Sequence, residues 1–428
     1  ATAGGAILAV AGWDGTTTSP SALTTGTAYG NHGGSIIIGG TGQDGNVDIG
    51  SATESTTLAG DNVSLTANNG YVQVGYNGAG SGAIDVVALG NATLTAGTEG
   101  AEFAQIGNGG WNTFGNESGN ITVDASGNVV LDGGSGQETY AQIGHGGTAS
   151  ISGSEGYSDI GLITVDGKAV TLAAGSSQGS YAQIGNGGYL SGQNLAGTAT
   201  LGGDITVNAV NSVSLAGGGE DAYAQIGNGG ALVNSNAANG AGGTISGDIV
   251  VAVASASDPI TVTAGSGAQS YAQIGNGGYG ENMPASGATV NFAVSGNVSI
   301  SDLTLTGSDT GADGYAQIGN GDASKTGTGD ISGDITIGPG QSPGSTWRQH
   351  AAGQPASHAA RSACGQRQQR RHRSFRRSHV VFGPVARSGY AQSDGHRRQV
   401  DHPRRAHRTG LGQRLWPAWR AAGGRRLL

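Results

Sequence analysis

The stretch Tyr181-Ala182-Gln183-Ile184-Gly185-Asn186-Gly187 decides the fold of this chain, because the same seven residues recur along it. Intact copies begin at Tyr223, Tyr271 and Tyr315, and near copies begin at Tyr71, Phe103 and Tyr140. The copies are spaced by about 40 residues, a period typical of stacked structural repeats. The sequence therefore predicts a stack of like units, not a globular core with one active pocket.

One repeat unit shows what the stacked element is. Residues Asp204–Asn208 and Ser212–Ala216 alternate polar and apolar side chains, and Tyr223–Gly227 follows after the glycine run Gly217–Gly219. Alternation with period two and bends at Gly or Asn indicate three short strands per coil. An all-β parallel β-helix follows, in which each coil pairs with its neighbours. The side chains expected to face the core are Ile205, Val207, Val213, Leu215, Ala224 and Ile226.

The segments that follow each Asn-Gly-Gly differ in length and sequence. We interpret them as loops extruded from one corner of the coil, where partner contacts usually lie. These segments are Trp111–Gly119, Thr148–Ser158, Tyr189–Gly203, Ala231–Gly247 and Tyr279–Ser295.

The sequence predicts three parts: an N-terminal edge or preceding coil at 1–32, a parallel β-helix repeat domain at 33–342, and a basic low-complexity tail at 343–428, which differs sharply in charge from the rest. Residues 1–347 hold 2 basic and 27 acidic side chains, net −25, whereas the remainder holds 18 Arg and 2 acids, net +16. We expect no nucleic acid to bind residues 1–342. No stretch is long enough to predict a transmembrane segment. The only cysteine, Cys364, lies in the tail, so disulfides cannot staple the repeats.

The tail from about Gln341 is rich in Arg, His, Gln, Ala and Pro and lacks the repeat. One interpretation is a disordered basic segment that binds nucleic acid or an acidic surface. The other, which we favour, is a shifted coding frame, because GC-rich DNA read out of frame yields this mixture. Either way the sequence predicts an unpacked tail.

The phrases Gly119-Asn120-Ile121-Thr122-Val123, Gly203-Asp204-Ile205-Thr206-Val207 and Gly296-Asn297-Val298-Ser299-Ile300 resemble the repeats of filamentous-haemagglutinin-like adhesins. These are passengers of bacterial two-partner secretion and autotransporter systems. The resemblance implies a right-handed β-helix and an extracellular or outer-surface location. It also implies adhesion or biofilm contact, with host or matrix glycans or surface proteins as partners and an outer-membrane translocator during export. The chain begins within the pattern, as a fragment of a longer protein would.

Tyr and Gln of the repeat share one strand face, and Ala and Ile share the other. If Ala and Ile face the core, an outward row of rings and amides could bind sugars. The alternative, which we favour, is a stacked ladder under a loop that binds nothing. The candidate glycan-contact row comprises Tyr71, Phe103, Tyr140, Tyr181, Tyr223, Tyr271 and Tyr315, with Gln73, Gln105, Gln142, Gln183, Gln225, Gln273 and Gln317 beside them.

The other recurring polar residues suggest structure rather than chemistry. A turn-capping amide ladder is expected at Asn108, Asn186, Asn228, Asn276 and Asn320, with His145 as a single substitute. Asp204, Asp248 and Asp334 stand where turns enter strands, and structural turns are favoured there over calcium sites. We expect no cofactor, no metal and no catalytic residue.

An adhesin passenger fragment, not an enzyme, is therefore the favoured function. A carbohydrate-active β-helix is one alternative, but a lyase of that shape typically uses a basic residue, and residues 1–347 offer only Lys168 and Lys325. A hydrolase needs paired carboxylates at a defined separation. A self-associating matrix protein is the other alternative.

Overall fold

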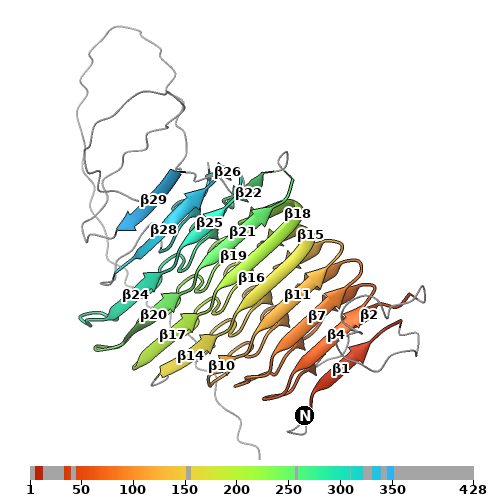
Figure 1. The fold of residues 1–428 in the computed structure, drawn as a ribbon. Coiled ribbons are helices and arrows are strands. Elements are labelled where there is room, and N and C mark those ends of the chain that lie inside the picture. The colour runs from red at the N-terminus through yellow and green to blue at the C-terminus, as the bar shows by residue number, and fades with distance from the viewer. Residues whose placement is uncertain are drawn as a thin grey trace, which may run out of the picture. The chain divides into compact units, whose positions relative to one another are not determined.

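In the computed structural model the chain is all-β, and its strands form three sheets (Figure 1). The structure describes residues 5–12, 33–39, 45–150, 156–255, 259–308, 310–321 and 330–338, together with the backbone of strand 345–350. No helix occurs within these ranges. The predicted all-β class is confirmed. Apart from strand 345–350, the predicted tail lies outside the described residues, as do most of residues 1–32.

The large sheet has 16 strands and carries two of the three predicted strand rows. Its main path runs β1 (Ile7–Val10), β4 (Thr56–Gly60), β7 (Ile84–Ala88), β11 (Ile121–Ala125), β15 (Ile163–Ala173), β18 (Ile205–Ala216), β21 (Ile249–Val253), β25 (Val298–Ile300), β28 (Ser332–Ile337) and β29 (Ser345–His350). The second row holds β2 (Ile36–Gly39), β5 (Val63–Thr66), β8 (Ala92–Thr95), β12 (Val129–Asp132), β22 (Ile260–Thr263) and β26 (Leu303–Thr306). Strands β15 and β18 span both rows, since each pairs with strands of both.

The heptapeptide sheet has eight strands and contains every copy of the repeated motif. Its order is β27 (Tyr315–Ile318), β23 (Tyr271–Ile274), β19 (Tyr223–Ile226), β16 (Tyr181–Ile184), β13 (Tyr140–Ile143), β9 (Phe103–Ile106), β6 (Val72–Val74) and β3 (Val47–Ile49). Neighbouring strands are parallel and keep the motif in register, with Tyr181 opposite Tyr223 and Gln183 opposite Gln225. Each strand thus pairs with its equivalent one repeat along the chain.

The first core lies between these two sheets. Side chains at the predicted inward positions of one repeat, including Ile205, Val213 and Ile226, are fully buried in a single cluster. The cluster extends from Ile38 to Ile335 through every described repeat. A single coil could not bury this face alone, so each coil depends on its neighbours for stability. The predicted core positions are confirmed.

A fourth row of strands, the short sheet, was not predicted. It runs β10 (Glu117–Ser118), β14 (Gly156–Ile160), β17 (Thr198–Gly202), β20 (Gly242–Ser246) and β24 (Asn291–Ser295), and Figure 1 shows these strands side by side in chain order. These strands arise inside the segments predicted to be extruded loops. With their connecting turns they enclose a second core that includes Leu195, Leu201, Val233 and Phe292. The extruded-loop prediction is therefore wrong for the described parts of these segments.

Columns of glycine account for part of the high glycine content of this chain, because backbones of adjacent coils meet where side chains would not fit. A Cβ atom built on Gly185 would overlap the carbonyl of Gly227, and one built on Gly227 would overlap that of Gly275. A second column at the corner before the large sheet behaves likewise: a Cβ on Gly203 would overlap the carbonyl of Gly161. Parallel coils can approach this closely only with hydrogen at those positions.

The large sheet ends differently from its prediction. Strand β29 pairs antiparallel with β28, whereas the other strand pairs described in this sheet are parallel. The sequence predicted no strand after residue 343, so the prediction is wrong for Ser345–His350.

Candidate functional site

The predicted row of rings and amides exists, but it is buried rather than outward-facing. The rings from Phe103 to Tyr315 are at most 2% exposed, and Tyr71, at the N-terminal end, is partly exposed. Consecutive rings stack nearly parallel, with centroids 4.6 to 5.0 Å apart. Turn residues such as Tyr189 and Ala231 pack against the row. The outward orientation is wrong, because the segments taken for loops cover this face. The alternative that we favoured, a stacked ladder under a loop, describes the observed geometry of the rings and amides.

The glutamines bind one coil to the next through both ends of their amides. Gln183 Nε2 donates to the carbonyls of Gly227 and Gly229 at 3.1 and 3.0 Å, in the following coil. Its Oε1 accepts a hydrogen bond from the Tyr223 hydroxyl at 3.1 Å. The same contacts recur at Gln105, Gln142, Gln225 and Gln273. A buried amide whose donors and acceptor are all paired stabilises a single register.

Phe103 interrupts the hydroxyl row, and the preceding coil compensates. Without a hydroxyl, Phe103 cannot donate to Gln73 Oε1. Instead Asn77 Nδ2 donates to this oxygen at 3.2 Å. Asn77 forms an isolated β-bridge with Gly109 of the next coil. Later coils have glycine at the repeat position that Asn77 occupies. The exchange shows that the structure satisfies the buried Oε1 even where the tyrosine is missing.

The predicted amide ladder is confirmed, and His145 substitutes for asparagine within it. The backbone N–H of Asn186 donates to Asn228 Oδ1 at 3.0 Å, and that of His145 donates to Asn186 Oδ1 at 2.9 Å. The imidazole continues the series: Nδ1 accepts from the Asn108 N–H at 3.0 Å, and Nε2 donates to the Gly119 carbonyl at 2.8 Å. Burial lowers the pKa of His145 to about 4. It is therefore a neutral structural residue.

The aspartates that enter the large sheet also form a structural ladder. Asp204 Oδ1 accepts from the Asp248 N–H at 2.9 Å, and Asp248 Oδ1 accepts from the Asn297 N–H at 2.7 Å. Across the described ranges, no group of three or more His, Cys, Asp or Glu side chains could hold a metal ion. The turn interpretation of these residues is confirmed.

A pair of buried carboxyl groups is the feature that sequence reasoning missed. Glu117 on β10 lies opposite Asp159 on β14, on adjacent parallel strands of the short sheet. Both side chains are 0% exposed, and their four oxygens lack a well-aligned hydrogen-bond donor among the described residues. Burial raises the pKa of both groups, and each also acts on the other. Because the pair is sealed from solvent, it does not offer the accessible carboxylates that a glycoside hydrolase needs.

The repeat itself contained the signal for this pair. The coils can be aligned on the glycine that precedes each strand of the large sheet. In the later coils, the short-sheet residue two positions before that glycine is aliphatic. It is Leu201, Ile245, Val294 and Ile331 in four coils, but Glu117 and Asp159 in the two coils before them. Register confirms the alignment, since Asp159 pairs with Leu201. Two acids in an aliphatic column mark an exception that a repeat-by-repeat comparison can detect.

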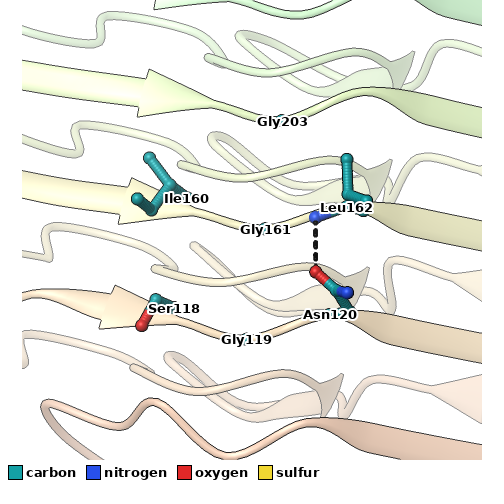
Figure 2. Close-up of a pocket in the computed structure, with 7 residues that line it drawn as sticks. All are labelled: Ser118, Gly119, Asn120, Ile160, Gly161, Leu162 and Gly203. Atoms are coloured by element: carbon teal, nitrogen blue, oxygen red, sulfur yellow. Dashed lines mark hydrogen bonds between the residues drawn. The ribbon is translucent and has the colours of Figure 1, made fainter.

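A shallow groove and an aromatic turn lie on the exposed surface. The groove, of about 290 Å³, runs over Gly119, Gly161 and Gly203, with Ile160 and Leu162 standing on either side of its floor (Figure 2). The aromatic turn follows β9, and there Trp111 and Phe114 are 43% and 61% exposed. No other aromatic side chain that the structure describes is exposed to this degree.

Comparisons with known proteins identify no relative of this chain. No family model, curated protein or solved structure matches this chain. In the part of the chain that the structure describes, no helix is both long enough and apolar enough to cross a membrane.

Proposed function

We propose that this chain is a right-handed parallel β-helix section of an exported bacterial adhesin passenger, acting as a stiff scaffold at the cell surface. One observation carries the proposal: every consecutive pair of coils from Val47 to Ile318 is joined in register by the heptapeptide sheet. Side-chain ladders reinforce the backbone pairing within that sheet. Such a stack resists bending, because each coil boundary must break many contacts before it opens.

The aromatic turn is the proposed contact surface of this scaffold. Trp111 and Phe114 present apolar ring faces to solvent, and the exposed Asn112 and Asn116 flank them with amide groups. Rings and amides together suit a sugar, because a pyranose offers apolar C–H faces and hydroxyl groups. The net charge of −25 over residues 1–347 favours a neutral glycan over an anionic one. Host or matrix glycans, or a surface protein carrying them, are therefore the proposed partners.

A binding assay with matched variants tests this proposal. The purified chain is applied to a glycan array and to host cells, beside a Trp111→Ala/Phe114→Ala double variant. Saturable binding that the double variant loses supports the proposal. Val210→Ala serves as the control, because Val210 is 57% exposed but lies on β18, in the large sheet. Binding that all variants retain, or an absence of binding throughout, refutes the contact surface.

The scaffold and its export are tested separately. The coil stack is tested by its length in small-angle X-ray scattering: variants that lack or duplicate whole coils should differ by about 4.8 Å per coil along the stack, the spacing of paired strands. Export is expected to depend on an outer-membrane translocator, so deletion of the translocator should leave the chain inside the cell. Lengths that do not follow the number of coils would refute the scaffold, whatever the glycan assay shows.

A further inference from the structure

The carboxyl pair lies at the weakest edge of the short sheet. Strand β10 has only two residues and is the terminal strand of that sheet, paired on one side with β14. Two residue pairs make the contact: Glu117 opposite Asp159, and Ser118 opposite Ile160. The carboxyl groups therefore occupy one of the two residue pairs between β10 and β14. The backbone of β10 is also held by hydrogen bonds from the Ser118 N–H to the Gly80 carbonyl at 2.7 Å and from Asn108 Nδ2 to the Ser118 carbonyl at 2.9 Å.

Among the residues that the structure describes, no cationic group acts on the pKa of either carboxyl group. Apart from burial and hydrogen bonding, what shifts the pKa of either group is its partner carboxyl. Tyr157 lies two residues before Asp159, and burial raises its pKa further above neutrality. His145 is fixed as a neutral donor to the Gly119 carbonyl. Two carboxylates buried side by side without a counter-ion would repel each other strongly.

One proton between the carboxyl groups removes this conflict. A protonated carboxyl group gains an O–H donor, and its neighbour is the acceptor in reach. This arrangement explains why the four oxygens have no other donor. A leucine at the same position, as in the next coil at Leu201, would need no proton at all.

We propose that Glu117 and Asp159 form a proton-sharing latch that fastens β10 to β14 and releases this strand as the pH rises. The turn that carries Trp111 and Phe114 leads directly into β10, so release would loosen that turn. The latch does not depend on that turn binding a partner. When the strand opens, the shared proton passes to water and both groups ionise in solvent.

The direction of the pH dependence follows from where the proton is held. Burial raises both pKa values in the folded chain, and the neighbouring Asp159 carboxyl raises that of Glu117 further. The contribution of the pair to stability is therefore fully present below about pH 4, the ordinary carboxyl pKa, and is lost as the pH rises. Where the closed pair holds one shared proton, opening releases that proton, and the equilibrium constant for opening should rise about tenfold per pH unit.

Hydrogen exchange followed by mass spectrometry tests the latch on the full chain. Protection factors, corrected for intrinsic exchange, are measured for residues 111–120 and 156–162 between pH 5.5 and 8.5. The expected result is a loss of about tenfold per pH unit in the wild type, and none in a Glu117→Gln/Asp159→Asn double variant. Strand β19, which lies away from the edge, should show no such loss in either protein.

A matched control separates the latch from a general effect of charge. Asp124 and Asp166 are also in register on adjacent strands, β11 and β15, but the first is exposed and the second is partly exposed. Asp124→Asn/Asp166→Asn removes the same charge and should keep the wild-type slope. Carboxyl carbon chemical shifts of Glu117 and Asp159 in the wild type provide a second measurement that needs no variant. The proposal is overturned if the wild type shows no slope, if the Glu117→Gln/Asp159→Asn variant keeps it, if both groups titrate near their ordinary pKa, or if Ca²⁺ or Mg²⁺ abolishes the slope.

Discussion

The hydrogen bond from Tyr223 to Gln183 gives a sharp test of the buried ladder. Tyr223→Phe keeps the stacked ring, as Phe103 does naturally between Tyr71 and Tyr140, but removes the donor to Gln183 Oε1. The lost bond and the unsatisfied buried oxygen should cost about 1 to 3 kcal/mol of unfolding free energy. Unlike Gln73, Gln183 has a glycine, Gly187, at the position from which an asparagine amide could compensate.

Gln183→Met should cost more, because three hydrogen bonds disappear at once. Its two donors to Gly227 and Gly229 are lost together with the acceptor for Tyr223, so a cost of about 3 to 5 kcal/mol is expected. The double variant should cost less than the sum of the two single variants by about 1 kcal/mol, since both lose the shared bond.

Equilibrium urea denaturation, followed by circular dichroism, measures all three variants. Tyr76→Phe is the control, because Tyr76 lies outside the stacked row and is only partly buried. The reasoning fails if Tyr223→Phe costs no more than Tyr76→Phe, or if the two ladder substitutions are simply additive.

Three further predictions concern single positions. Gly227→Ala should cost at least about 3 kcal/mol in urea denaturation, because the added Cβ overlaps the Gly275 carbonyl. Gly100→Ala should cost under about 1 kcal/mol, because the Gln137 carbonyl oxygen lies at an ordinary contact distance of 3.7 Å from the added Cβ. The pKa of His145 falls from 6.5 to about 4 on folding, so its contribution is complete above pH 6.5 and is lost as the pH falls through 4. The loss amounts to about 3 kcal/mol, and His145→Asn should remove this acid sensitivity in denaturation curves measured between pH 3.5 and 7.5. Gln269→Gly should increase the free energy of unfolding by up to about 1 kcal/mol and so raise the denaturation midpoint, because Gln269 has a left-handed φ of 59°. A lower midpoint would contradict this backbone strain.

Alternation predicted three of the four strand rows, because those rows carry clear period-two patterns. In Ile205–Leu215, apolar and polar residues alternate, so the buried face was evident from the sequence. The Tyr-Ala-Gln-Ile strand is different: both faces are buried, and period-two reasoning assumes that one face meets water. The amide of Gln183 was read as a surface group, although a fully paired amide can be buried.

The short sheet escaped prediction because its strands are embedded in irregular turns. Leu190 and Leu232 have left-handed φ values of 58° and 57°, a conformation that residue type does not announce. Neighbouring coils hold these turns through backbone bonds, such as Leu190 N–H to the Ala231 carbonyl at 3.0 Å. Tertiary contacts thus decided the backbone here. The carboxyl pair was accessible from sequence only by aligning coils, since Glu117 and Asp159 are 42 residues apart.

The uniform boundary between coils has a consequence for how this protein can vary between generations. Tyr223 meets Tyr181 through the contacts by which Tyr271 meets Tyr223, so the chain does not distinguish one junction from the next. Removing residues 181–222 would place Tyr223 after Ser180 and restore the ring stack against Tyr140. Unequal recombination between gene repeats can therefore lengthen or shorten the molecule by whole coils. The length of the stack would then be inherited as a copy number, adjustable without the invention of any new contact.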